Sequence, residues 1–199
     1  MIDSSLTDVE IRPLLKDRLL SSHAPDTIIL DELGVCRGQV RIDLALVNGI
    51  IHGYEIKSER DSLRRLSGQI EFYGKVLDRA TLVVARRHLS VALTVLPSWW
   101  GVLCVDKVKQ GHLLKNVRKG KLNPRRDARA LVELLWLDDA LELLRQHQLD
   151  RGMKGKPRRL VWDRVCENFD IEEIASAVRQ NLKARAETQV ARRQLQDGE

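Results

Sequence analysis

Cysteine is scarce in this sequence of 199 residues, and no long apolar run is present. The three cysteines, Cys36, Cys104 and Cys166, lie far apart, with no Cys-x-x-Cys pair and no paired histidines beside them. Neither a disulfide framework nor a zinc site is therefore expected. The longest weakly charged stretch, residues 90–105, contains Pro97 and is shorter than the roughly 20 apolar residues that cross a bilayer. No membrane span is expected.

Two further features are missing. The N-terminal residues lack the basic and apolar segments of a secretory signal, so a cytoplasmic location is expected. His52 and His112 have no partner at metal-ligand spacing. We therefore expect them at surface or core positions rather than in a metal site.

Positive charge is present but unevenly distributed. Residues 1–100 carry 13 basic and 13 acidic side chains, whereas residues 101–199 carry 21 basic and 15 acidic ones. The basic side chains concentrate in residues 107–129 and 151–164. Blocks of this kind favour binding to phosphate polymers. We therefore expect a nucleic-acid partner, and the candidate contacts are Lys154, Lys156, Arg158, Arg159 and Arg164.

Hydrophobic periodicity predicts an α/β core over residues 1–106. Helical spacing occurs in residues 7–21, after Ser58 and around residues 90–96. Strand-type patterns occur in residues 27–33, 41–47, 50–57, 80–85 and 101–106. This order predicts a mixed sheet in which antiparallel strands come first and parallel strands follow.

The remainder of the chain is expected to be mostly helical. Residues 107–126 are basic and contain Gly111, Gly120 and Pro124, which favours a linker or a surface loop. Residues 127–199 are expected to form a helical basic region with a charged tail. Helices are predicted over residues 127–147, 160–169 and 171–185.

Asp43 and the string Glu55-Ile56-Lys57 are the residues with the clearest chemical meaning. Glu55 and Lys57 are two residues apart on a strand, so they project from the same face. Asp43 shares that face only in some hairpin registers. A two-residue turn at Asn48-Gly49 would pair Asp43 with Tyr54 and turn it away. A three-residue loop with a bulge at Gly49 would pair Asp43 with Gly53 and place the two acids as diagonal neighbours.

In the second register, the opposite face would carry apolar side chains: Ile42, Leu44, Leu46, Tyr54 and Ile56. Ordinary cross-strand salt bridges to Arg41 and Lys57 are the alternative role for Asp43 and Glu55. Gln69 and Tyr73, one turn apart on the following helix, could equally form the polar border of a packed helix.

Asp43 followed by Glu-x-Lys on the next strand, within an αβββαβ frame, resembles the PD-(D/E)XK superfamily of metal-dependent phosphodiesterases, which have the restriction-endonuclease-like fold. Ile42 stands where the family name has proline. Gln69 and Tyr73 match the Gln-x-x-x-Tyr element of the exonuclease-like branch. Residues 31–84 look most like a group of small stand-alone bacterial and phage proteins. The resemblance covers residues 1–106.

The resemblance implies a role for each matching residue. Asp43, Glu55 and the backbone carbonyl of Ile56 would bind Mg²⁺ or Mn²⁺, because hard cations prefer oxygen ligands. Lys57 would orient or help to deprotonate the attacking water, and Gln69 and Tyr73 would position the phosphate or the lysine. An additional acid is usual, and the candidates are Glu32, which we prefer, and Glu10.

The expected function is that of a metal-dependent nuclease acting on DNA, in repair, processing or phage-related defence. A non-catalytic nucleic-acid-binding protein on the same fold is one alternative, and an adaptor whose basic helices bind an acidic protein is another. Residues 144–165 also resemble SAP-type helix-extension-helix DNA-binding modules, with a solvated helical cap as the alternative.

Overall fold

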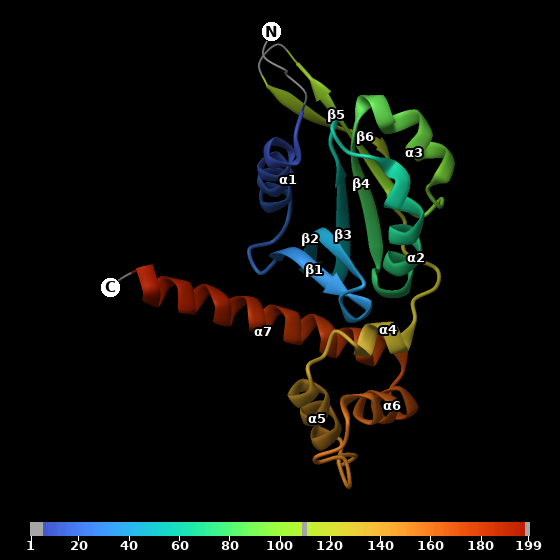
Figure 1. Cartoon of the computed structure of the whole chain (residues 1–199). Helices are drawn as coiled ribbons and strands as arrows, with labels where there is room; N and C mark the ends of the chain where they lie inside the picture. The colour runs from blue at the N-terminus through green and yellow to red at the C-terminus, as the bar shows by residue number, and fades with distance from the viewer. Residues whose placement is uncertain (1–5, 109–110, 198–199) are drawn as a thin grey trace.

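The computed structural model describes residues 6–108 and 111–197, and its centre is a six-stranded mixed sheet whose strands lie in chain order (Figure 1). Neighbouring strands are antiparallel from β1 to β3, parallel from β3 to β5, and antiparallel again between β5 and β6. The strands are β1 (Ile28–Val35), β2 (Val40–Asn48), β3 (Ile50–Lys57), β4 (Arg79–Ala85), β5 (Gly101–Lys107) and β6 (His112–Arg118).

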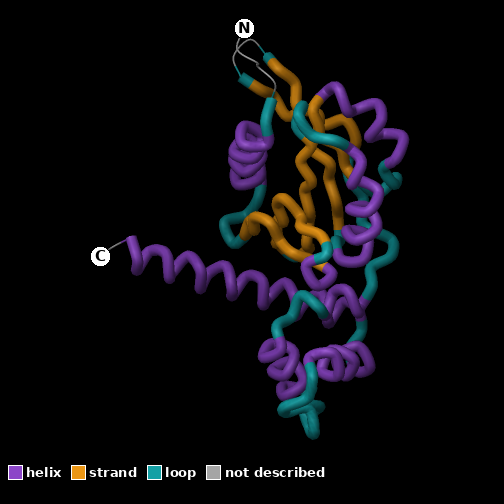
Figure 2. The backbone as a smooth tube through the Cα atoms, in the orientation of Figure 1, coloured by secondary structure: helices purple, strands orange, loops and turns teal. Residues whose placement is uncertain are grey.

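Helices cover both faces of this sheet. Helix α1 (Asp8–Ser22) lies on one face, and α2 (Leu66–Val76) and α3 (Leu89–Val95) lie on the other (Figures 1 and 2). Each face has its own cluster of buried apolar side chains. Short 3₁₀ turns at Cys36–Gly38, Leu63–Arg65 and Arg86–His88 join the elements. The predicted α/β class, the αβββαβ order and the helical C-terminal region are confirmed.

The β2–β3 hairpin has a register that neither sequence-based alternative anticipated. Asn48 pairs with Ile50 and Leu44 pairs with Tyr54, leaving only Gly49 between the strands. Gly49 has a φ of +65°, a backbone conformation that residues other than glycine adopt at a steric cost. The observed pairing ends at Leu44 and Tyr54; one further step of the same register would set Asp43 opposite Glu55. The two-residue turn that would have separated the acids is absent.

The alternation of side chains between the two faces of the sheet is interrupted at Glu32 on β1 and Asp43 on β2. Glu32 has a φ of +53°, and the pairing runs from Asp31↔Leu44 to Leu33↔Ile42 without a Glu32 pair. Leu44 and Leu46 pack toward α1 with Tyr54 and Ile56, as expected. Ile42 does not: it packs on the α2 side. Its predicted place beside Leu44 was wrong because the local kink reverses the alternation.

Residues 107–126, expected to form a linker or a surface loop, include a strand. This strand is β6, whose exposed and basic residues, together with only one well-buried leucine, weaken the alternation signal. After β6 the chain is fastened to the core. The Asn123 amide donates to the carbonyls of Gly74 and Leu77 at the end of α2, and the Asp127 N–H donates to the Lys75 carbonyl. These bonds satisfy carbonyls that the helix leaves without partners.

Four helices follow: α4 (Ala128–Val132), α5 (Leu137–Gln146), α6 (Arg158–Asn168) and α7 (Ile171–Asp197). The single helix predicted over residues 127–147 is in fact α4 and α5, separated by a turn at residues 133–136. Their apolar side chains belong to the same core as the α2 face of the sheet. Buried Asp78 strengthens this junction by accepting from Ile51 N–H and pairing with Arg126, which also contacts Glu172 of α7. None of the helices in the described residues is long and apolar enough to cross a membrane.

Candidate functional site

An open cleft of about 810 Å³ lies where the start of α1, the strands β2 and β3, and the start of α2 come together. Asp43, Glu55, Ile56, Lys57 and Gln69 all line it, so the structure gathers most of the residues selected from the sequence in one place. Tyr73 lies beneath them, fully buried. Phe72 and residues 38–41, which lead into and begin β2, form part of the walls.

Glu55 is the centre of the hydrogen bonding in this cleft. Its side chain is 1% exposed, and Lys57, 5% exposed, contacts Glu55 Oε1 at 2.5 Å through Nζ. The Gln69 amide donates to the same oxygen at 2.5 Å. The Tyr73 hydroxyl donates to Glu55 Oε2 and also lies 2.6 Å from the Arg41 carbonyl oxygen. A buried carboxylate needs such partners, because burial without them costs several kcal/mol.

Gln69 and Tyr73 reach Glu55 because they are four residues apart on α2, one above the other on a single helix face. Burial and the neighbouring Glu55 carboxylate raise the pKa of Tyr73, which keeps the hydroxyl protonated as a donor. The expected roles were to position the phosphate or Lys57. In the structure both side chains donate hydrogen bonds to Glu55, and their role toward a phosphate stays a prediction.

Asp43 faces the same cleft from β2. Its Oδ2 accepts from the Ile56 N–H at 2.7 Å, which fixes the carboxylate against β3. Burial, followed by repulsion from Glu55, raises the pKa of Asp43 to about 7. Two carboxylates that disfavour each other's charge in one cleft form an environment that a cation would relieve.

Glu32, the preferred additional acid, also lines the cleft, but its carboxylate is held by Arg12 at 3.0 Å. Arg12 lies between several acids: its guanidinium contacts Asp8, Asp31 and Glu32 and donates to the Asp43 carbonyl at 2.7 Å. Glu10, the alternative acid, lies outside the cleft. It accepts from the Thr7 N–H and hydroxyl in a capping box that begins α1.

Arg12, Arg64 and Arg65 of the cleft were not predicted from the sequence, and Arg41 was considered only as an ion-pair partner. Arg12 comes from α1, Arg41 from β2, and Arg64 and Arg65 precede α2. Arg41, Arg64 and Arg65 form no ion pair with another described residue. A signal was present: Arg41 is two residues from Asp43, and Arg64 and Arg65 come five and four residues before Gln69. The first half of the chain has no net charge, and the residues that line the cleft are likewise balanced, with five basic and five acidic side chains.

The donor set suits a hard divalent cation with few protein ligands. Within residues 6–108 and 111–197, no three histidine, cysteine or acidic side chains gather as a metal-binding group. Mg²⁺, however, is usually held by one or two carboxylates, with water and substrate phosphates completing its shell. Asp43 and Glu55 provide two such carboxylates. The buried Gln69 Oε1 beside them has no hydrogen-bond partner in the described chain.

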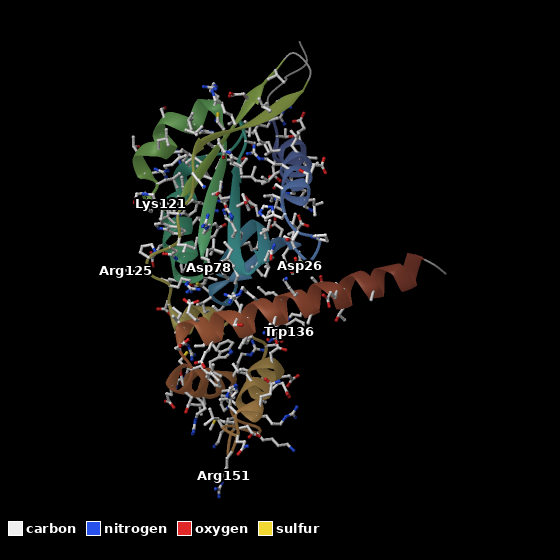
Figure 3. The ribbon with its side chains drawn as sticks, turned by 180° about the vertical axis from the view of Figure 1, so that it is seen from behind. Asp26, Asp78, Lys121, Arg125, Trp136 and Arg151 are labelled. Atoms are coloured by element: carbon white, nitrogen blue, oxygen red, sulfur yellow. The ribbon has the colours of Figure 1, made fainter. Side chains whose placement is uncertain are left out.

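The candidate contacts in the basic helical region lie elsewhere. Lys154, Lys156, Arg158 and Arg159 are exposed, whereas Arg164 is half-buried and 3.9 Å from Glu167. Arg158 also lies over the Trp162 ring. Figure 3 shows Arg151, in the loop before α6, at the tip of the helical region and beyond α7 from the sheet. The loop is therefore remote from the acids of the cleft.

Comparisons with known proteins place the whole chain in context. The family model described as bacteriophage P4 protein cII matches residues 3–196. Protein cII of Enterobacteria phage P4 is 30% identical over 122 residues, which are 61% of this chain and 46% of that protein. The chain thus spans about half the length of this relative. A solved protein of unknown function from Silicibacter pomeroyi is 23% identical, with a TM-score of 0.41, over 69% of this chain and 87% of that one.

Proposed function

The chain belongs to the bacteriophage P4 protein cII family, and we propose that this member is a metal-dependent nuclease that hydrolyses phosphodiester bonds of DNA. The observation that carries the proposal is the set of side chains that contact Glu55. Lys57, Gln69 and Tyr73, chosen from the sequence for their spacing, all converge on this one buried carboxylate, and Asp43 faces the same cleft.

The stability of the core does not require a buried ion pair such as Glu55–Lys57. A buried Glu–Lys pair adds little stability compared with apolar residues of the same volume. Here the pair opens onto a cleft, and a second carboxylate with a raised pKa lies nearby. Strongly perturbed acids in a cleft are a feature of functional sites.

In the proposed reaction, Asp43 and Glu55 would hold Mg²⁺ or Mn²⁺, and the Ile56 carbonyl and water would be further ligands. The cation, when bound, supplies Lewis acidity and a more acidic bound water. Lys57 Nζ, which contacts Glu55, would orient the attacking water and stabilise the negative charge that develops on the phosphate. Gln69 and Tyr73 fix Glu55, and Arg41, Arg64 and Arg65 attract the DNA backbone.

Arg41, Arg64 and Arg65, which form the arginine rim of the cleft, also support a second candidate function. This is a nucleic-acid-binding protein without catalysis. Unpaired arginines in a cleft bind phosphates whether or not a bond is then broken. The two candidates differ in what they require of the acids. A protein that only binds DNA should bind better when acids facing a polyanion are removed, whereas a nuclease loses its reaction.

Incubation of the full chain with labelled single-stranded, duplex and branched DNA, in Mg²⁺, Mn²⁺ or EDTA, tests the proposal. We expect cleavage that EDTA abolishes. Asp43→Asn and Glu55→Gln should lower the rate by about a hundredfold or more while DNA is still retained. The matched controls Asp17→Asn and Glu71→Gln change exposed acids outside the cleft and should cleave normally. Retention of DNA without cleavage in any metal would favour the binding protein.

A further inference from the structure

A second cleft, of about 320 Å³, lies near the C-terminal end of α1 and shares no lining residue with the candidate nuclease cleft. Its walls come from α1, from β3 to β5, and from β6 with the segment that follows. Its cationic residues are Arg18, Arg79, Arg118 and Lys119, and His23 is also present. No aspartate or glutamate is among the described residues that line it.

The four cationic side chains differ in the hydrogen bonds that they form. Arg18 donates to the Leu114 carbonyl, and Arg118 donates to the carbonyls of Trp100 and Pro97, so these two side chains are fixed by the fold. Arg79 and Lys119 form no hydrogen bond or ion pair through their side chains with any other described residue. The Arg79 Nε is buried and has no partner.

A buried donor without a partner is unfavourable, and the cost is larger when the group is charged. A guanidinium is rarely left in this state, because its N–H groups match the geometry of carboxylate and phosphate oxygens. An anion in the cleft would accept from Arg79 and would meet no nearby carboxylate. Lys119 is exposed and lines the same cleft, so its flexible side chain can reach a ligand at the cleft entrance.

Neutral polar groups complete the lining. The His52 Nε2 lies 2.8 Å from the Thr81 hydroxyl, and the Tyr54 hydroxyl lies 3.1 Å from His52 Nδ1, with the two rings stacked. At the end of α1, Ser22 and His23 contact the carbonyls of Arg18 and Leu19. Carbonyls that would repel an anion are thus already satisfied.

We propose that this second cleft binds a phosphate group, carried by a small molecule such as a nucleotide or by the end of a nucleic-acid strand. Arg79 is the principal ligand, Lys119 closes over the phosphate, and Arg18 and Arg118 supply fixed positive charge. The site is independent of the proposed nuclease reaction, because its evidence comes from other residues. The volume leaves room for a phosphate together with part of the molecule that bears it.

Calorimetric titration of the full chain tests the site with defined probes: inorganic phosphate, adenosine monophosphate, and an oligonucleotide with a 5′-phosphate or a 5′-hydroxyl. We expect saturable binding of at least one phosphate probe. Arg79→Gln and Lys119→Gln should each weaken it about tenfold or more, the scale expected when a charge-assisted bond is removed. Preference for the 5′-phosphate oligonucleotide over both small probes would identify a strand end as the source, and the reverse a small molecule.

Matched controls come from the same part of the chain. Lys121→Gln and Arg125→Gln remove exposed positive charges outside both clefts, and both residues lie along one side of the molecule in Figure 3. These variants should bind as the wild type does. Arg65→Gln reports on the nuclease cleft. Binding that disappears in Arg65→Gln and is kept in Arg79→Gln and Lys119→Gln would overturn the proposal, as would the absence of saturable binding of every phosphate probe.

Arg79 is half-buried, so circular dichroism must first show that Arg79→Gln folds. Lys119→Gln changes an exposed side chain and keeps the test decisive if Arg79→Gln does not fold. Arg79→Lys retains the charge but loses the two-pronged geometry. It should therefore bind more weakly than the wild type and more tightly than Arg79→Gln.

Discussion

The Tyr73 hydroxyl on α2 donates a hydrogen bond to Glu55 Oε2 on β3, and both side chains are almost completely buried. The same hydroxyl lies 2.6 Å from the Arg41 carbonyl oxygen on β2. One phenol thus links a helix to two adjacent strands at the point where the cleft begins. The Tyr73 ring is also stacked on buried Trp100. The position of Glu55 is therefore set by the packing of the core beneath it.

Replacing Tyr73 with phenylalanine should separate this hydrogen bond from the packing. Tyr73→Phe keeps the ring but removes the hydroxyl that donates to the Glu55 carboxylate. Hydrogen bonds to charged groups contribute about 1.5–3 kcal/mol, so the free energy of unfolding should fall by about this amount in urea titrations. Cleavage of DNA should slow as well, because Glu55 becomes less well positioned.

Tyr54→Phe is the matched control on the opposite face of the sheet. The Tyr54 hydroxyl lies 3.1 Å from neutral His52 and contacts no carboxylate. We expect a loss of about 0.5–1.5 kcal/mol and no change in cleavage. If the two variants lose equal stability and equal activity, the hydroxyl of Tyr73 has no special part in holding Glu55.

The buried pair Glu55–Lys57 should behave as a unit. Lys57→Met leaves the Glu55 charge without its cation, and breaking a buried pair in this way costs about 3–5 kcal/mol. Glu55→Gln/Lys57→Met removes both charges and should recover much of that loss. A double-mutant cycle from urea unfolding measures the coupling. Additive single effects would show that Gln69 and Tyr73 stabilise Glu55 without help from Lys57.

The sequence predicted which residues gather in the cleft better than it predicted their arrangement. Glu55 and Lys57 share a face by strand periodicity, and Gln69 and Tyr73 share a face by helical periodicity, so these pairs follow from local rules. The place of Asp43 depends on a hairpin register in which Gly49 alone separates the paired residues. This register differs by two residues from the one that pairs Asp43 with Gly53. A shift of two residues keeps each side chain on the same face of the sheet, so Asp43 and Glu55 still share a face.

Other features depend on contacts that local patterns do not encode. The positive φ of Glu32 reverses the alternation at Ile42, and glutamate gives no warning of that backbone conformation. The turn at residues 133–136 that ends α4 contains neither glycine nor proline, so the helical pattern continues across it. Arg12 joins the acids of the cleft only because α1 packs against the sheet. Tertiary packing decides each of these.

His52 should make stability fall in mild acid. Burial and nearby Arg79 lower the pKa of His52 from 6.5 to about 3 in the folded protein. Between these values the unfolded chain binds a proton that the folded chain does not, so stability decreases as the pH falls below about 6.5. The slope contributed is at most about 1.4 kcal/mol per pH unit.

Comparison with His52→Gln isolates this contribution. Urea unfolding between pH 7 and pH 4 should show the wild type losing stability relative to His52→Gln, with the difference growing toward low pH. His147→Gln, which changes an exposed histidine but retains His52, should keep the wild-type slope. Parallel curves for the wild type and His52→Gln would mean that His52 is protonated equally in both states.

Arg12 should oppose the binding of a divalent cation. Its guanidinium lies among Asp8, Asp31 and Glu32 and 3.8 Å from Asp43 Oδ1, so it already neutralises part of the acidic edge. Arg12→Gln removes that charge. Without metal, the melting temperature should fall because the acids repel one another. With Mn²⁺, the variant should gain more in melting temperature than the wild type, since a cation that binds the folded state stabilises it by mass action.

Lys16→Gln is the control for Arg12, because Lys16 pairs with Asp31 at 2.7 Å but does not line the cleft. Its response to Mn²⁺ should match that of the wild type. The double variant Arg12→Gln/Asp43→Asn should lose the added gain. An equal Mn²⁺ response in all four proteins would place the bound cation away from Asp43.

The two groups of candidate phosphate-binding side chains should separate DNA binding from cleavage. Replacing Lys154, Lys156, Arg158 and Arg159 together with glutamine neutralises the exposed loop before α6 and the first two residues of α6, a segment remote from the acids. Arg64→Gln/Arg65→Gln neutralises the rim of the cleft. For every phosphate that the protein no longer neutralises, the slope of log affinity against log salt should become shallower by about 0.9 for duplex DNA or about 0.7 for single strands. Both variants should therefore show flatter slopes in fluorescence anisotropy across a salt series.

Their cleavage rates should differ. At saturating DNA, the loop variant should retain the single-turnover rate, because its side chains contribute affinity but do not approach the scissile phosphate. The rim variant should lose rate as well as affinity, since Arg64 and Arg65 line the cleft that holds Asp43 and Glu55. An unchanged salt slope in the loop variant would make residues 151–159 an ordinary solvated surface, and DNA binding would then depend on the rim. An unchanged rate in the rim variant would instead place the reacting phosphate beyond the reach of these two arginines.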